Sequence, residues 1–198
     1  MGSTQSEFRT SKIIYMSPKV IIISLIFLIS SITIITGISL FSKKNEIRNH
    51  IIEYRNSHGG NSPSSISMYE NLEKYSDSFN IPKYIIYNIA YKETHYRGPF
   101  DWKYKPSLTS SVGAVGPMQV MPSTANMIHG KKISVKKLKN DIEFNIATSA
   151  ELLHKLFKKY GNWKIVCGCY NTGKPIVNGY AEFCSENKDY QKNWVYVD

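Results

Sequence analysis

Apolar residues follow two patterns along the chain, a continuous run near the N-terminus and helical spacing beyond it. Residues 20–41 form a run of 22 positions without a charged side chain. At about 1.5 Å of rise per residue, a helix of this length crosses the roughly 30 Å hydrocarbon core of a bilayer. The apolar region of a cleaved signal peptide is shorter and precedes a small-residue cleavage site, which is missing here. The run therefore predicts an uncleaved transmembrane anchor, and basic residues on both sides leave its orientation open.

Beyond residue 66 the apolar positions recur at intervals of three and four, without an alternating strand pattern. The pairs Ser67–Glu70 and Asn140–Glu143 fit capping boxes, which mark helix starts. Glycines and prolines within residues 97–116 predict an ordered loop instead of a helix. The fold class is therefore mostly α, with helices that begin at Ser67, Pro82, Pro122, Asn140 and Trp163.

These patterns predict four segments along the chain. Residues 1–19 form a short tail and residues 20–41 the anchor. Residues 42–67 are expected to be a flexible tether, because their second half is rich in Ser, Gly and Asn. Residues 68–198 form the helical domain, and its long ordered loop is of the kind that is usually functional.

The chain is basic, with 25 Lys and Arg against 15 Asp and Glu and a net charge of +10. This excess suggests an acidic partner, but the basic stripe with stacking aromatic residues that nucleic-acid binding requires is missing. Three cysteines do not make a disulfide framework, although a pair between Cys184 and Cys167 or Cys169 stays open. Metal-ligand spacings, a P-loop and a dinucleotide fingerprint are also missing, so we expect no metal and no cofactor.

Glu93 is the first candidate for chemistry. It continues the apolar stripe of the helix that follows Pro82, on the face of Ile86, Ile89 and Ala90. Burial raises the pKa of a carboxyl group, and a general acid at neutral pH needs such a raised pKa. The alternative is a structural carboxylate at a helix end that reaches water.

Two later segments carry further candidates. Residues 110–125, SSVGAVGPMQVMPSTA, contain too many glycines for a helix and too many apolar residues for a solvated loop. Gly113 and its neighbours allow close approach of the backbone to a ligand, and the Gln119 amide suits sugar hydroxyl and N-acetyl groups. Tyr170 and Asn171 place an aromatic hydroxyl and an amide at the end of another helix.

The order of these motifs resembles that of the soluble lytic transglycosylase family, which has a lysozyme-like fold. The motifs are Glu93-Thr94, the segment from Ser110 to Ala125, Asn145-Ile146, and Tyr170-Asn171-Thr172-Gly173, and the resemblance covers about residues 68–177.

The resemblance implies cleavage of the β-1,4 bond between N-acetylmuramic acid and N-acetylglucosamine in peptidoglycan, with formation of a 1,6-anhydro sugar. Glu93 would protonate the leaving oxygen and then deprotonate the C6 hydroxyl. Substrate contacts would come from Ser110, Gly113, Met118, Gln119, Tyr170 and Asn171. Ser111 is the alternative to Ser110, while core packing is the alternative role for Met118 and helix capping for Tyr170.

Two interpretations of the C-terminus stay open. Asn178-Gly179-Tyr180 resembles the ending of transglycosylases that serve conjugation and type IV secretion, which would make a secretion apparatus a partner. Alternatively, residues 186–190 are a degraded form of a motif that closes the groove in longer relatives. We favour the first interpretation.

The leading hypothesis is a transglycosylase of the bacterial cell membrane, anchored through residues 20–41, with its catalytic domain outside the cytoplasm on glycan strands. One rival is a hydrolytic muramidase on the same fold, in which Asp101 or another acid activates water. The other is a wall-binding or secretion scaffold without activity. The basic side chains within residues 131–139 are a solvated face, or they attract acidic wall polymers or carboxylates of the stem peptide.

Overall fold

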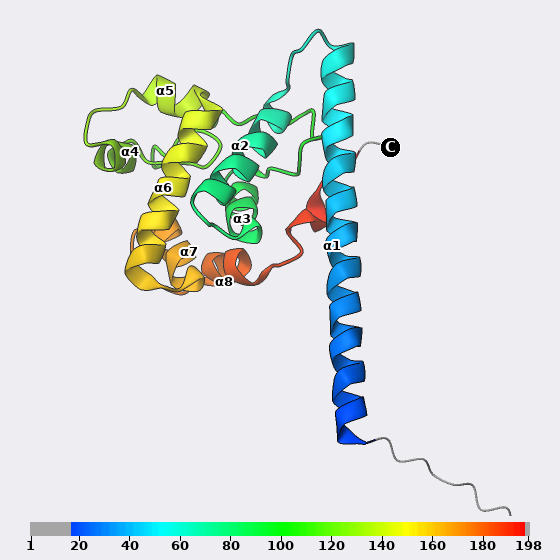
Figure 1. Ribbon diagram of the computed structural model, residues 1–198. Helices are drawn as coiled ribbons and strands as arrows, with labels where there is room; N and C mark the ends of the chain where they lie inside the picture. Colours follow the sequence, from blue (N-terminus) through cyan, green and yellow to red (C-terminus); the bar gives the residue numbers. More distant parts are fainter. Residues whose placement is uncertain (1–16, 197–198) are drawn as a thin grey trace, which may run out of the picture. The chain divides into compact units, whose positions relative to one another are not determined.

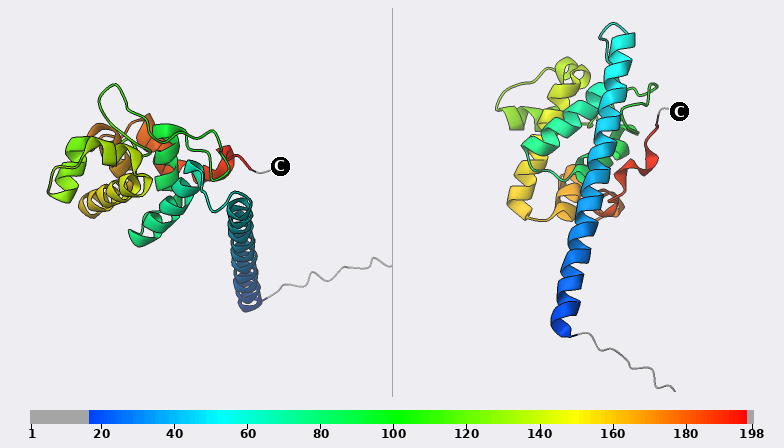
Figure 2. Two further views of the ribbon diagram at one scale, coloured as in Figure 1. Left: turned by 90° about the horizontal axis from the view of Figure 1, so that it is seen from above. Right: turned by 45° about the vertical axis from the view of Figure 1, so that its right-hand side comes forward.

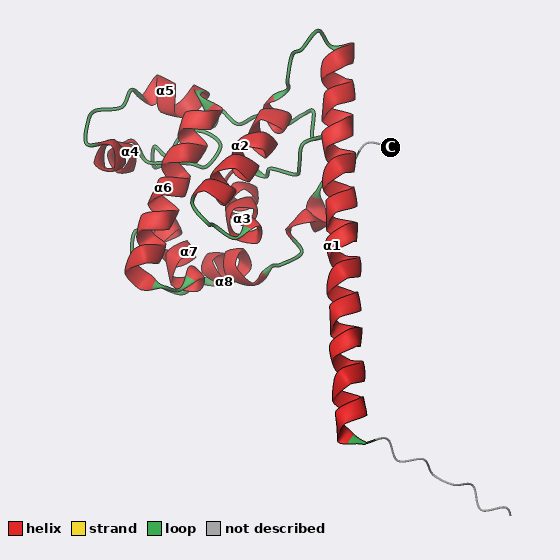
Figure 3. Ribbon diagram, viewed as in Figure 1, coloured by secondary structure: helices red, strands yellow, loops and turns green. Residues whose placement is uncertain are grey.

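The computed structural model describes residues 17–196, and within them the chain forms helices and loops without a strand (Figure 3). Two compact units divide the chain, residues 1–53 and 54–198. The bounds of the helices, marked in Figure 1, are α1 Pro18–Ser57, α2 Ser64–Ser78, α3 Lys83–Thr94, α4 Pro122–His129, α5 Val135–Asn140, α6 Ile142–Tyr160, α7 Trp163–Thr172, α8 Gly179–Glu186 and the 3₁₀ helix η1 Tyr190–Asn193.

Helix α1 contains the apolar run of the predicted anchor. Its apolar window has a mean hydropathy of 2.6 and is not buried within the protein. By length and composition it is the one helix among the described residues that is able to cross a membrane. The predicted tail, residues 1–19, lies mostly outside the described residues.

The expected tether at residues 42–67 is wrong for most of its length. Helix α1 continues to Ser57, because its Lys, Glu and Arg residues favour a helix and no glycine intervenes before Gly59. Helix α2 starts at Ser64, behind Pro63, so the capping box at Ser67 is also wrong. Only residues 58–63 are left as a connection.

The core of the second unit lies between α2, α3, α6, α7 and α8. Helix α6 contacts α2 and α7, while α8 contacts α3 and α7. Figure 1 and the right view of Figure 2 show α4 and α5 toward the N-terminal part of α6, and α7 at its C-terminal end. The apolar stripe of α3 is fully buried as predicted, through Ile85, Ile86, Ile89 and Ala90. Each large aliphatic side chain buried in this way contributes about 1.5–3 kcal/mol to folding.

The mostly α prediction is confirmed, and so are the helices at Pro122 and Trp163. The start of α6 differs by one residue. Asn140 is the last residue of α5, a helix that was not predicted in the basic segment. The carboxylate of Asp141 caps α6 by accepting from the Phe144 amide at 2.9 Å. Helix α8 and η1 also follow where no helix was predicted.

The connection from α7 to α8 folds back over α7 at Gly168. A Cβ atom at Gly168 would lie 1.8 Å from the Ile176 carbonyl oxygen, so only glycine allows this crossing. The crossing brings α8 against both α7 and α3, and α3 carries Glu93.

Candidate active site

Glu93 lies in the last turn of α3, partly buried, and accepts a hydrogen bond from the Tyr180 hydroxyl of α8. The Tyr180 Oη to Glu93 Oε1 distance is 2.6 Å. Burial raises the pKa of Glu93, while the Tyr180 bond and the charge of Lys92 partly offset this rise. The carboxyl group is therefore suited to hold a proton at higher pH than an exposed glutamate.

The chain turns sharply behind Glu93. His95, the C-cap of α3, adopts a left-handed conformation with φ 57°. Thr94 is buried; its hydroxyl lies 2.8 Å from the Tyr104 hydroxyl and donates to the Pro117 carbonyl at 2.8 Å. These bonds join the end of α3 to the segment that contains Met118 and Gln119.

Asn145 of α6 holds that segment in place. Its amide nitrogen donates to the carbonyls of Val115, at 2.9 Å, and Leu138, at 2.8 Å. Its side-chain oxygen accepts from the Met118 amide at 2.9 Å. A Cβ atom at Gly116 would lie 2.5 Å from the Asn145 amide nitrogen, so this close approach needs glycine. Asn145 is fully buried and all its hydrogen-bonding groups are used except one lone pair.

Met118 and Gln119 are adjacent in the chain but differ in the burial of their side chains. The Met118 side chain is fully buried, in agreement with the core-packing alternative. Gln119 is partly exposed, has a left-handed backbone with φ 49°, and donates from Nε2 to the Gly116 carbonyl at 2.8 Å. A non-glycine residue in this conformation stores strain of the kind that gathers at functional sites.

Tyr170 lies on the same side of the core as Glu93. Its hydroxyl donates to the Met118 carbonyl at 2.7 Å and lies 3.1 Å from the Ser149 hydroxyl. Burial raises the pKa of Tyr170, and the charge of Glu93 raises it further. The same two causes raise the pKa of Tyr180. Both phenols are therefore close to Glu93 and stay protonated, so that they act as hydrogen-bond donors.

The other predicted contacts lie in turns. Ser110 accepts the Ala114 amide with its side chain at 3.0 Å, and Gly113 has φ 88° in the same turn. Asn171 is exposed at the end of α7 and accepts from the Asn178 side chain at 3.1 Å. The structure thus brings together Glu93, Tyr170 and the Met118 backbone, and it contains no direct bond from these groups to Ser110, Gly113 or Asn171 among the described residues.

Sequence reasoning missed two residues of this cluster, Tyr180 as a partner of Glu93 and Asn145 as the support of the loop. Both belong to short motifs that the sequence analysis noted, at residues 178–180 and 145–146, but spacing along the chain did not assign them a role. Tyr180 is 87 positions from Glu93.

The two remaining acidic candidates are engaged elsewhere. Asp101 is buried, 6% exposed, and its carboxylate pairs with Arg97 Nε at 3.1 Å. Glu186 pairs with Lys164 on the surface.

The three cysteines are buried free thiols. A hydrogen bond with Cys167 and burial raise the pKa of the Cys184 thiol, which makes Cys167, not Cys169, its neighbour. Within residues 17–196 no three His, Cys, Asp or Glu side chains lie close enough together to hold a metal ion.

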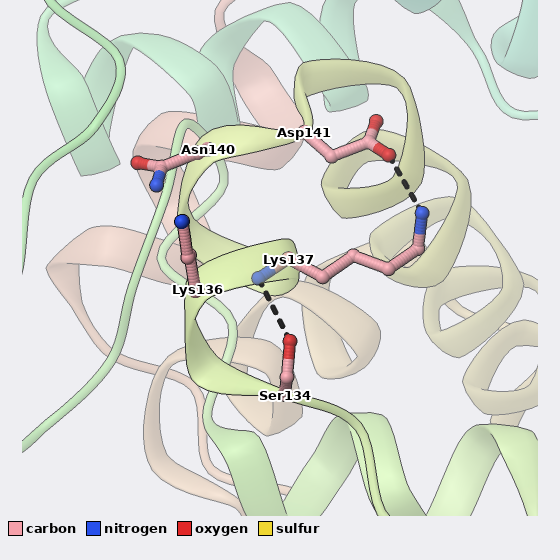
Figure 4. Close-up of a pocket in the computed structure, with 5 residues that line it drawn as sticks. All are labelled: Ser134, Lys136, Lys137, Asn140 and Asp141. Atoms are coloured by element: carbon pink, nitrogen blue, oxygen red, sulfur yellow. Dashed lines mark hydrogen bonds and ion pairs between the residues drawn. The ribbon is translucent and has the colours of Figure 1, made fainter.

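Among the described residues, cavities lie at the end of α3 and on α5. One, of about 480 Å³, adjoins the C-terminal end of α3 and is lined by Thr94, His95 and residues of the following loop. The other, of about 550 Å³, lies on α5. Figure 4 shows two interactions among its lining residues: the Ser134 hydroxyl accepts from the Lys137 amide, and the Lys137 ammonium pairs with Asp141.

Comparison with known proteins gives one family and several solved structures. The family model described as Transglycosylase SLT domain matches residues 70–193. No curated protein matches the chain.

The solved structures are lytic transglycosylases. An inactive mutant of Slt from Pseudomonas aeruginosa is 20% identical, with a TM-score of 0.47 over 62% of this chain and 23% of that chain. The 70 kDa soluble enzyme from Escherichia coli is 22% identical, with a TM-score of 0.46 over 63% and 22%. A complex of the 70 kDa soluble enzyme with bulgecin A is 25% identical, with the same TM-score and coverage. This chain thus spans less than a quarter of each.

Proposed function

The chain belongs to the family of transglycosylase SLT domains, and we propose that it is a membrane-anchored lytic transglycosylase that acts on peptidoglycan. It would cleave the β-1,4 bond between N-acetylmuramic acid and N-acetylglucosamine, with Glu93 as the single acid and base. The observation that carries this proposal is the partly buried Glu93 carboxyl, which accepts a hydrogen bond from one phenol and forms no ion pair among the described residues.

In the first step Glu93 gives its proton to the glycosidic oxygen while the bond from that oxygen to the muramic C1 breaks. Burial raises the pKa of Glu93, which favours the protonated form that this step requires. As the proton leaves, the Tyr180 hydroxyl donates to the carboxylate that forms, and a bond to a charged acceptor is stronger than one to a neutral acceptor. This interaction therefore favours the transition state over the ground state.

In the second step the Glu93 carboxylate takes the proton of the muramic C6 hydroxyl, and the C6 oxygen bonds to C1. The acid is regenerated, and water is neither consumed nor released. One carboxyl group serves both transfers, which agrees with the ion pairing of Asp101 to Arg97. A hydrolase would need a second carboxylate close enough to activate water.

Helix α1 supports the anchored form of this proposal. Its exposed apolar surface, with side chains such as Ile26, Phe27 and Ile35 each more than half exposed, suits lipid more than water. Because peptidoglycan lies outside the cytoplasm, the helical domain is then extracytoplasmic. In this proposal the anchor lies within α1 and the catalytic domain runs from α2 onward.

The test is mass spectrometry of purified peptidoglycan after digestion by the full chain in detergent. The wild type should release 1,6-anhydro-muropeptides, and Glu93→Gln should release none. Glu182→Gln, the same change on the exposed surface of α8, is the matched control and should be active. Products with reducing ends would instead identify a hydrolase, and no release by any variant would favour a scaffold.

A further inference from the structure

The cavity of about 480 Å³ at the end of α3 has a cationic lining. Of its charged side chains, only Asp101 is acidic, and the Arg97 guanidinium pairs with it. Lys103 and Lys105 are exposed and have no ionic partner among the described residues. The remaining polar groups around the space come from Tyr91, Thr94, His95 and Tyr104.

The cavity is built into the same framework as the proposed active site. Thr94 follows Glu93 directly and lines the cavity, and its hydroxyl is bonded to both Tyr104 and the Pro117 carbonyl. The same hydrogen bonds therefore fix the part of the cavity lining formed by Thr94 and Tyr104 and the loop before Met118.

The loop that lines the cavity is also held in place by contacts outside the cavity. The Val195 amide donates to the Arg97 carbonyl at 2.8 Å, which ties the C-terminal segment to the start of the loop. Gly98 lies so close to the Trp194 ring that a Cβ atom would be 2.9 Å from it. Asp101, buried beneath Arg97, then fixes the direction of that side chain. These contacts preorganise the loop that carries both lysines.

From this placement we propose that the cavity binds a carboxylate of the peptide stem on the strand being cleaved. The inference rests on the proposed function. N-acetylmuramic acid, the sugar whose C1 and C6 react at Glu93, also carries the peptide, and the cavity begins one residue from Glu93. Lys103 and Lys105 supply the positive charges, because Asp101 pairs with Arg97 and does not neutralise the two lysines.

A phosphodiester of a wall polymer offers the same negative charge, but the reaction argues against it at this position. A phosphodiester on the C6 oxygen of the reacting sugar would block formation of the anhydro ring. The peptide is attached elsewhere on that sugar and leaves C6 free.

The experiment measures binding without turnover, by titration calorimetry on the full chain in detergent with Glu93→Gln. The ligand is a disaccharide peptide with its peptide carboxylates either free or converted to amides. We expect the free form to bind about tenfold more tightly, a factor equivalent to about 1.4 kcal/mol. The double change Lys103→Ala with Lys105→Ala should abolish this difference.

The matched control changes Lys131 and Lys132 to alanine, which removes the same charge from an exposed segment away from the cavity. The preference for the free carboxylates should persist there. Equal binding of the two ligands, an equal loss in the control, or no binding at all would overturn the proposal. Tighter binding of a polyglycerol phosphate that depends on Lys103 and Lys105 would assign the cavity to a phosphodiester instead. Product analysis is independent of this titration, so either proposal can fail alone.

Discussion

The hydrogen bond from the Tyr180 hydroxyl to Glu93 predicts how removal of that hydroxyl changes the pKa of Glu93 and the rate of the reaction. Tyr180→Phe keeps the ring, which packs in the partly buried interface between α3 and α8, and deletes the 2.6 Å hydrogen bond. A hydrogen bond to a charged group contributes about 1.5–3 kcal/mol. Since one pKa unit corresponds to 1.36 kcal/mol, its loss should raise the pKa of Glu93 by about 1–2 units further.

The sign of this shift follows from the donor. The phenol stabilises the ionised carboxylate, which is the form that appears as Glu93 gives up its proton. Without the phenol the proton leaves less readily, so kcat should fall by about 10- to 100-fold at pH 7. The KM should change little, because the bond strengthens only as charge develops on Glu93.

The assay is the release of anhydro-muropeptides as a function of pH. In Tyr180→Phe the alkaline limb of kcat should move upward by about 1–2 pH units, while Tyr160→Phe, which removes a phenol at the end of α6, should match the wild type. An unchanged profile, or an alkaline limb that moves downward, would refute the role assigned to Tyr180.

Three further predictions concern stability. Burial raises the pKa of Glu93, so the folded state binds more protons than the unfolded state, and stability is lost as pH rises from about 4.5 through the folded pKa. Glu93→Gln should therefore raise the Tm by about 2 °C at pH 7 and leave it unchanged at pH 4. A lower Tm of this variant at pH 7 would contradict the argument. Gly168→Ala should destabilise the protein by about 3 kcal/mol in urea unfolding, because its Cβ meets the Ile176 carbonyl, whereas Gly179→Ala has open space and should be neutral. Asn145→Ala removes the Asn145 partner of the Met118 amide and of the Leu138 and Val115 carbonyls, of which the Val115 carbonyl still accepts from the Val120 amide. The change should cost about 3 kcal/mol and most of the activity, and a fully active variant would show that the loop does not depend on Asn145.

Local patterns determined the helical class, the buried stripe of α3 and the place of Glu93 at its end. Helical spacing is a short-range property, and Ile85, Ile86 and Ile89 are buried as that spacing requires. The ends of elements were less well determined. Asn140 and Asp141 are both good caps, and only the fold of α5 decided that Asp141 caps α6.

Only the tertiary structure decided which groups surround Glu93. Tyr180 reaches it because the chain crosses α7 at Gly168 and returns α8 to the side of α3, a contact that neither segment encodes alone. The same holds for Asn145, whose amide saturates three backbone groups on two other segments. The sequence by itself specified a carboxyl group on an apolar stripe, because helical periodicity depends on neighbouring residues. Its pKa, its phenol donor and the cationic cavity beside it depend on burial and on contacts between distant segments, and these exist only in the folded chain.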